Sequence, residues 1–406
     1  MTVTRPGWLY ILLLGSVTAL PPLSIDMGLP AIAQISQALG VSLGSASQTL
    51  SIFILGFVLG PLVFGPLSDR IGRRPIMLGG LIVFTVAGIA CTFAHDIGFL
   101  LGARFLQGCA AGAAATLPIA IVRDRFEGQE ARKLQSYLAL VNNLAPLLAP
   151  LIGSLILMFG DWRWVYAALA ICGVWLILGA QGGFKETLTS ARPAASKSLL
   201  ASYLEIVKNR RFVFSTLIMA FNFAGMFAYI AASPLVFMNN LGLSSGGFAV
   251  LFALTAMGTI IGSWLNTRLT HKGISEVSIL GWALASSLVI AILMTIESKV
   301  EFHTLYVLTS LVVLSNICTG LVMPNATHSA LEELATTAGS GAALLRATQM
   351  LGGAGASLLA SMFYDGKSSF AMTSVMLVCA ALAGLCFLIG HRSLAPAPAS
   401  EEVVSH

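Results

Sequence analysis

The sequence predicts an all-α integral membrane protein with twelve transmembrane helices, arranged as six plus six around a central linker. Of its 406 residues, 57% are hydrophobic and 10% are charged, whereas a soluble protein carries about 25% charged residues. The apolar residues form long unbroken runs, not the alternating pattern of a membrane β-barrel. Because backbone groups inside a bilayer must be hydrogen-bonded within the protein, these runs are expected to be helical.

Twelve apolar segments can be drawn along the chain, each close to the ~20 residues that a membrane-spanning helix needs. They are expected at 8–32, 46–66, 75–94, 97–121, 134–159, 164–184, 212–238, 247–268, 275–296, 303–327, 340–362 and 369–390. The first segment is longer than the h-region of a signal peptide and contains Pro21, Pro22 and Asp26. We therefore expect it to be retained as the first span.

One polar, basic stretch at 185–211 divides the segments into two sets of six. The predicted organisation is an N-terminal six-helix bundle (1–184), a linker (185–211), a C-terminal six-helix bundle (212–391) and a tail (392–406). The tail is rich in Pro and Ala and then acidic, so it is expected to be disordered.

The basic residues predict the orientation of the chain. Of 22 Lys and Arg, seventeen lie on one side of the segment map and three on the other, while Arg104 and Arg346 lie inside segments. Because Lys and Arg accumulate on the cytoplasmic side, both termini and the linker are expected there. The net charge of +5 is spread over membrane-edge loops, so it does not indicate nucleic-acid binding.

Several chemical functions have no sequence support. The six cysteines lie in apolar segments without a CxxC pair, so they are expected to pack between helices and not to bind metal. No GxxxxGK[ST] motif is present, which gives no indication of ATP use. The segments contain no Ser/His/Asp set or His/Glu cluster. We therefore expect no enzymatic activity and no bound cofactor.

The densest group of charges lies in "GPLSDRIGRRP" (65–75), the expected short turn between the second and third segments. The glycines allow a tight turn and close helix approach, and the acid and the arginines can reach helix ends or lipid phosphates. A basic loop that only obeys the positive-inside rule is the alternative. The residues concerned are Gly65, Asp69, Arg70, Gly72, Arg73 and Arg74.

Four motifs together resemble the major facilitator superfamily, specifically the drug:proton antiporters of the bicyclomycin/chloramphenicol resistance (Bcr/CflA) subfamily. The first is the stretch above, which resembles the family's loop between spans 2 and 3. The others are "RFLQG" (104–108), "APLLAPLIG" (145–153) in span 5, and "LSIDMGLPAI" (23–32) closing span 1. In the span-5 motif the residues of interest are Ala145, Pro146, Pro150 and Gly153. The resemblance implies two six-helix bundles that alternate between inward-open and outward-open states, with Asp69 and its arginines locking the cytoplasmic side.

Asp26 and Arg104 are charged residues at similar depths in segments 1 and 4. Such residues cost roughly 2.5–3.5 kcal/mol each to insert and usually face a cavity or a partner. The resemblance implies that both segments line a central cavity, so we expect the two side chains to face each other or to share a water. Asp26 would then load and release protons in competition with substrate; a purely structural Asp–Arg pair is the alternative.

Other polar side chains in apolar segments are candidates for the substrate cavity: Gln107, Asn142, Asn222, Tyr229, Asn316, Gln349 and Arg346. Each could instead make an interhelical hydrogen bond worth about 0.6 kcal/mol, and Arg346 could extend to the cytoplasmic edge. Some multidrug relatives carry a second acid where this chain has Thr18. Its absence favours neutral, zwitterionic or anionic substrates over lipophilic cations.

The sequence and the resemblance together indicate a proton-coupled multidrug efflux antiporter of a bacterial inner membrane. Its expected partners are a small-molecule drug, protons and membrane lipid, and it is expected to be a monomer. A metabolite exporter, for sugars or amino acids, is one alternative. A non-transporting receptor or scaffold is another, but such a protein gains nothing from costly charges inside the membrane.

Overall fold

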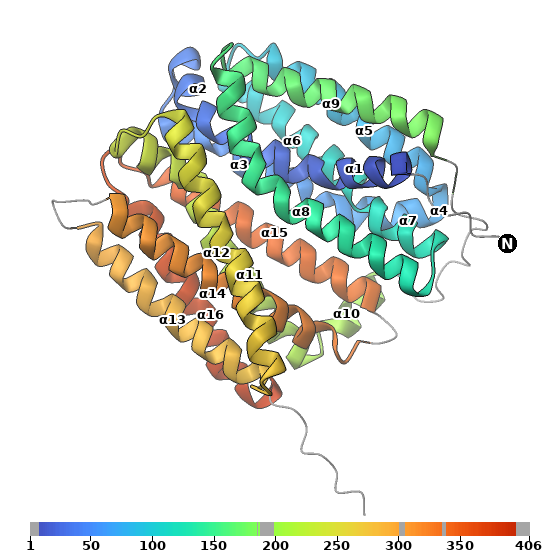
Figure 1. Ribbon diagram of the computed structural model, residues 1–406, viewed down its shortest axis with the longest axis vertical. Coiled ribbons are helices and arrows are strands. Elements are labelled where there is room, and N and C mark those ends of the chain that lie inside the picture. Colours follow the sequence, from blue (N-terminus) through green and yellow to red (C-terminus); the bar gives the residue numbers. More distant parts are fainter. Residues whose placement is uncertain (1–7, 185, 187–198, 300–304, 335–337, 395–406) are drawn as a thin grey trace, which may run out of the picture.

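The computed structural model describes residues 8–184, 186, 199–299, 305–334 and 338–394, which fold into helices joined by short turns (Figure 1). Within those ranges no residue forms a β-strand. The first half of the chain, blue to green, and the second half, yellow to red, form two helical bundles side by side (Figure 1). The predicted all-α membrane fold is confirmed.

In the first half, three of the spans are interrupted near prolines. A proline lacks the backbone N–H that a helix interior needs, so it starts a new helical segment after each break. The elements are α1 (Trp8–Asp26), η1 (Leu29–Ala31), α2 (Ile32–Leu39), α3 (Leu43–Phe57), the π-helical η2 (Gly60–Phe64), α4 (Gly65–Ile71), α5 (Arg73–Thr92), α6 (Ile97–Ala115), α7 (Leu117–Arg125), α8 (Gly128–Leu157) and α9 (Trp162–Gly183).

The second half contains longer and mostly unbroken helices. A short helix in the predicted linker precedes them. The elements are α10 (Leu199–Ile206), α11 (Arg210–Pro234), the π-helical η3 (Leu235–Asn240), α12 (Ser245–His271), α13 (Glu276–Glu297), α14 (Leu305–Leu331), α15 (Ala338–Met362) and α16 (Phe370–Leu394).

Among the described residues, eleven helices are long and apolar enough to cross a membrane, with broken helices counted as one. The one predicted span missing from this set is the eleventh (340–362), which corresponds to α15; that helix has 25 residues but contains Arg346, Gln349 and several glycines. Its composition suits a helix that other helices surround, not one that faces lipid on several sides.

Some predicted boundaries differ from the structure. Residues 65–75 are not a loop, because α4 continues to Ile71, α5 begins at Arg73, and Gly72 alone separates them. Gly72 has φ +116°, which a residue with a side chain rarely adopts. The last helix extends to Leu394, past the predicted boundary at 391. Most of the linker and the rest of the tail lie outside the described residues.

Two ends of the bundle can be distinguished. The helices that end at Ile71, Arg125 and His271 bring basic residues to one end, here called the basic end; the other is called the opposite end. Near the opposite end the halves touch through hydroxyl groups of α3: Ser47 donates to the Ala231 carbonyl (2.8 Å), Ser361 to Ser47 (3.1 Å) and Ser357 to Ser51 (2.7 Å).

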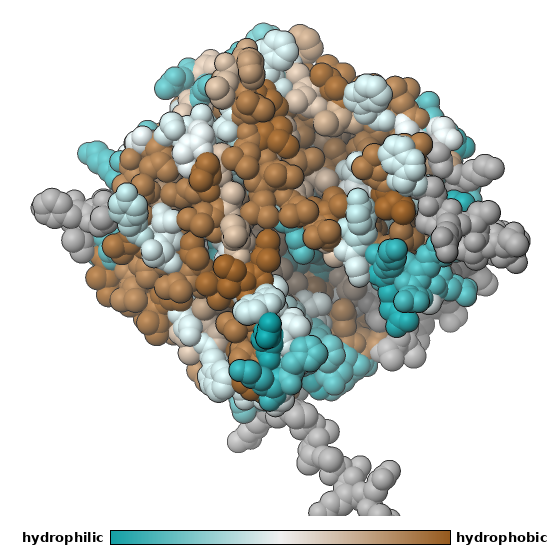
Figure 2. All heavy atoms as spheres, viewed as in Figure 1, coloured by the Kyte–Doolittle hydropathy of each residue, from teal (hydrophilic) through white to brown (hydrophobic). Residues whose placement is uncertain are grey.

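The halves separate toward the basic end. The hydrogen bonds found between described residues of the two halves all lie toward the opposite end. Figure 2 shows a hollow between the halves, flanked by hydrophilic residues. The structure is therefore closed at the opposite end and open at the basic end.

A cysteine pair at the closed contact tests this arrangement. In a background without native cysteines, Ser47→Cys with Ser361→Cys should form a disulfide, because the two hydroxyl oxygens are 3.1 Å apart. Locking this contact should stop transport, and a reductant should restore it. Loss of reactive thiols by maleimide labelling measures the bond, and each single variant is the control. Full transport after complete cross-linking would contradict the assignment.

Candidate functional site

Asp26 lies at a break in the first membrane span. The helix α1 ends at Asp26, and the chain turns through Met27 and Gly28 before η1. Asp26 is only 3% exposed, and its Oδ1 atom has no hydrogen-bond partner among the described residues. Irregular backbone at membrane depth is tolerated where protein covers it or where it lines a cavity, so the break holds a carboxyl group inside the protein.

The span-5 motif packs directly against this break. A Cβ atom at Gly153 of α8 would lie 2.2 Å from the Met27 carbonyl oxygen, so only glycine allows this approach. One turn and two turns earlier on the same helix, Pro150 and Ala145 are buried, while Pro146 is half-buried. The structure therefore brings this motif together with the segment that follows Asp26.

Arg104 is a fully enclosed cation at the centre of the first half. It is 2% exposed and donates to the Ser24 carbonyl of α1 (2.9 Å), the Thr49 carbonyl of α3 (3.3 Å) and Oε1 of Gln107 (2.7 Å). Its guanidinium also lies over the Phe53 ring at 4.3 Å. Because these acceptors come from three helices, Arg104 joins α1, α3 and α6.

The predicted contact between Asp26 and Arg104 is not present as an ion pair. No oxygen of Asp26 lies within 4.0 Å of the guanidinium, whose donors are directed to neutral acceptors. The two residues are linked through the backbone, because Ser24 accepts from Arg104 two residues before Asp26. A backbone carbonyl of α1, that of Ser24, accepts from the guanidinium in place of the carboxylate.

In the second half, two of the residues predicted to line the cavity are hydrogen-bonded to the same residue, Thr255. Tyr229 of α11 is hydrogen-bonded through its hydroxyl to Oγ1 of Thr255 on α12 (2.7 Å), and Asn316 of α14 donates to the Thr255 carbonyl (2.9 Å). All three residues are almost fully buried. They join three helices, as Arg104 does in the first half.

The remaining predicted residues do not converge on one point. Asn142 is half-buried on α8. Gln349 is fully buried, and neither its amide oxygen nor its amide nitrogen has a hydrogen-bond partner among the described residues. Arg346, one turn earlier on α15, is exposed.

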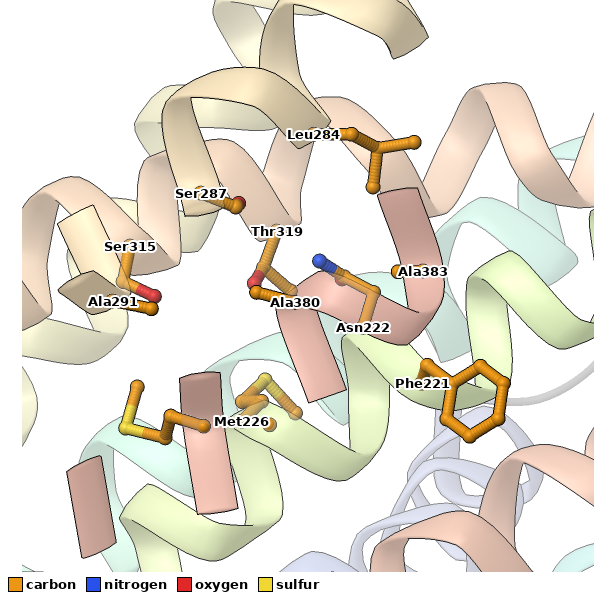
Figure 3. Close-up of a pocket in the computed structure, with 12 residues that line it drawn as sticks. Phe221, Asn222, Met226, Leu284, Ser287, Ala291, Ser315, Thr319, Ala380 and Ala383 are labelled. Atoms are coloured by element: carbon orange, nitrogen blue, oxygen red, sulfur yellow. The ribbon is translucent and has the colours of Figure 1, made fainter. Parts of the chain in front are cut away.

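Asn222 lies inside the second half, in a small cavity between α11, α13, α14 and α16 (Figure 3). The cavity holds about 30 Å³, which is room for about two water molecules. Ser287, Ser315 and Thr319 share its lining with apolar residues. Asn222 thus belongs to an internal polar cavity of one bundle, not to the space between the halves.

The charged stretch after span 2 is tied to its own half. Arg73 is 2% exposed and forms ion pairs with Asp69 (2.5 Å) and with Asp124 of α7 (2.9 Å). Arg74 donates to the Gln181 carbonyl (3.2 Å), and Arg70 is exposed. Because these partners all belong to the first half, the predicted lock between the halves is not formed in this open conformation.

Sequence reasoning did not identify two partners of this stretch. The carboxylate of Glu186 accepts from the backbone N–H groups of Arg73 and Arg74, both at 3.0 Å, and so caps the start of α5. A Cβ at Gly72 would lie 2.6 Å from this carboxylate. Asp124 in "RDR" and Glu186 beside the linker look like ordinary loop charges, and only the fold places them here.

Comparisons with known proteins agree with the fold. The family profile of the Major Facilitator Superfamily matches residues 14–357. A bacterial homologue of the human lysosomal transporter Spinster, solved in an inward-facing, unoccupied conformation, superposes with a TM-score of 0.75 over 95% of this chain and 96% of that one, at 15% identity.

Three curated relatives are similar in sequence. An uncharacterized MFS-type transporter, YdgK of Bacillus subtilis, is 32% identical over 92% of this chain and 93% of its own. A bicyclomycin resistance protein homologue of Haemophilus influenzae is 30% identical over 67% and 69%. Multidrug resistance protein D of Escherichia coli is 29% identical over 93% and 94%.

Replacing Gly153 by Ala should destabilise the protein. The added methyl group would meet the Met27 carbonyl at 2.2 Å, and such overpacking costs roughly 1–3 kcal/mol. Thermal unfolding of the purified protein measures the effect. Gly102→Ala on α6 is the control, because a Cβ there meets no atom within 4 Å. Equal stability of the two variants would contradict the close contact.

Removing the two acids around Arg73 should have unequal effects. Asp124 is 9% exposed and Asp69 is 45% exposed, so water screens the second pair more strongly. Asp124→Asn should therefore lower stability by roughly 1–3 kcal/mol, and Asp69→Asn by clearly less. Midpoints of thermal unfolding provide the comparison; a larger loss with Asp69→Asn would show that Asp124 is the minor partner.

Proposed function

The chain belongs to the Major Facilitator Superfamily, whose members are membrane transporters and not enzymes, and we propose that it exports small antibiotics in exchange for protons. The names of its relatives support the cargo: resistance to bicyclomycin for one, multidrug resistance for another. The basic end would face the cytoplasm, following the distribution of Lys and Arg. The open hollow would then receive substrate from inside the cell.

The single observation that carries proton coupling is the Asp26 carboxyl group. It is buried at a helix break, and Oδ1 has no partner among the described residues. An unpaired charge in such a place is costly, so Asp26 would be neutral, with a bound proton, in this closed environment. Opening at the opposite end would bring water to the carboxyl and let it exchange protons.

The energy of one proton is sufficient for useful export. A proton that enters down a 100 mV potential releases about 2.3 kcal/mol, which supports a roughly 50-fold substrate gradient because 1.4 kcal/mol corresponds to tenfold.

Coupling requires that the proton is bound and released on different sides of the membrane. Asp26 would bind a proton when the opposite end is open and release it toward the basic end as substrate binds. Arg104 would keep the break in place through the Ser24 carbonyl.

Expression in a pump-deficient bacterium tests the cargo. Resistance to a panel of antibiotics that differ in charge should rise, and a protonophore should abolish that resistance. Resistance that survives loss of the proton gradient would contradict proton coupling. Absence of resistance to every compound would favour export of a metabolite.

The Asp26→Asn variant tests the coupling residue. In detergent, substrate should trigger proton release from the wild type, and the variant should lose most of it because the amide cannot titrate. A pH-sensitive dye measures the release. Asp96→Asn is a suitable control, since Asp96 caps α6 through the Phe99 N–H and Asn caps equally well. Unchanged release from Asp26→Asn would remove Asp26 from this role.

A further inference from the structure

Arg346 is the second arginine inside the membrane, and it differs from Arg104 in every contact. Arg104 is 2% exposed and donates to three acceptors. Arg346 is exposed and makes no hydrogen bond or ion pair with any residue that the structure describes. It lies eight residues from the start of α15, about 12 Å along the helix at 1.5 Å per residue. Its position therefore has a cost that no residue in the described part of the chain offsets by pairing with it.

The face of α15 that carries Arg346 is the face that contacts the first half. Arg346, Met350, Ser357 and Ser361 are spaced by four, seven and four residues, which places them along one side of a helix. Ser357 and Ser361 are hydrogen-bonded to Ser51 and Ser47 of α3. We call this side the α3-facing stripe.

Along this stripe, the residues change from buried in the contact with α3 to exposed beside the hollow. Ser357 and Ser361 are almost fully buried, Met350 is 6% exposed, and Arg346 at the basic end of the stripe is exposed. The Arg346 side chain is exposed on the side of α15 that points toward the first half, at the end of the stripe where no hydrogen bond joins α15 to α3 among the described residues. The guanidinium therefore faces the space between the halves.

The residue of the first half at the level of Arg346 is apolar. The pairs Ser47–Ser361 and Ser51–Ser357 show that α3 and α15 run antiparallel. The same register, continued by eleven residues, sets Arg346 at the level of Leu62 in η2, and η2 contacts α15. The next acidic residue after Leu62 in the sequence is Asp69. It lies about two helical turns further and is paired with Arg73.

We propose that Arg346 binds the carboxylate, or a comparable oxyanion, of an amphipathic substrate that enters the hollow. A guanidinium offers a planar fork of donors that matches a carboxylate, and the wall at Leu62 would contact the apolar part of the same molecule. The proposal rests on the proposed export function and narrows it to anionic or zwitterionic compounds. A lipid phosphate presents the same chemistry, so the test must separate the two sources.

Binding of matched probes to the purified protein tests the proposal. The probes are chloramphenicol and its hemisuccinate, and norfloxacin methyl ester and norfloxacin; the second of each pair adds a carboxylate. Wild type should bind at least one carboxylate form more tightly than its partner without the carboxylate. Arg346→Gln should weaken binding of that form roughly 10- to 100-fold and leave binding of the partner without the carboxylate unchanged. Arg346→Lys, which keeps the charge without the fork, should fall between.

The control is Arg268→Gln, which removes an exposed arginine that lies over Trp264 and should change neither affinity. Thermal midpoints should be equal for wild type and the two Arg346 variants, since Arg346 makes no hydrogen bond or ion pair with the described residues that unfolding would break. Equal binding of both probe forms to wild type, or binding of neither, would overturn the proposal. If that outcome were found while cells expressing the protein still resisted antibiotics, the proposed export function would remain supported.

Native mass spectrometry separates the lipid source. Protein purified with and without added phosphatidylglycerol is compared for bound lipid in wild type and Arg346→Gln. The proposal expects equal lipid retention by both proteins and a carboxylate preference that does not depend on the lipid. Loss of one bound lipid in Arg346→Gln, without any change in probe affinity, would show that Arg346 serves the membrane and would overturn substrate recognition.

Discussion

The enclosed guanidinium of Arg104 constrains the first half more than any other group. A buried cation is costly unless its donors are satisfied, and here the acceptors are backbone carbonyls of α1 and α3 together with Gln107. Backbone carbonyls cannot move without their helices, so the positions of α1 and α3 relative to α6 follow from this one side chain. The break after Asp26 is fixed as well, because the α1 carbonyl is that of Ser24.

The contact between the halves has a different character. Its hydrogen bonds join serine hydroxyls with one another and with one carbonyl. At about 0.6 kcal/mol each inside a membrane, three such bonds contribute roughly 2 kcal/mol. One proton that crosses at 100 mV supplies about 2.3 kcal/mol. The hydrogen-bonded part of the closure is therefore comparable in energy with what one proton would supply under the proposed coupling, and packing of α3 against α15 adds to it.

Hydropathy and motifs predicted the fold and the interior position of Asp26 and Arg104, because lipid leaves few alternatives for long apolar runs. They did not predict which residues form hydrogen bonds or ion pairs with one another. Arg104 donates to backbone carbonyls and not to Asp26, and Arg73 pairs with Asp124. These pairings depend on how the helices pack and not on their composition. Gly72 illustrates both limits: its flexibility was expected, but the carboxylate beside it belongs to Glu186, at the start of the predicted linker and more than a hundred residues away in the sequence.

Two arginines of similar sequence context thus have opposite roles. Both interrupt apolar helices and carry the same insertion cost. Arg104 is enclosed by hydrogen-bond acceptors, whereas Arg346 is exposed and has no acceptor among the described residues. The helix around Arg346 reflects this difference: α15 is long enough to span the membrane, yet it is absent from the set of sufficiently apolar helices. Most of α15 is covered by neighbouring helices, and the α3-facing stripe becomes accessible only toward the basic end, at Arg346.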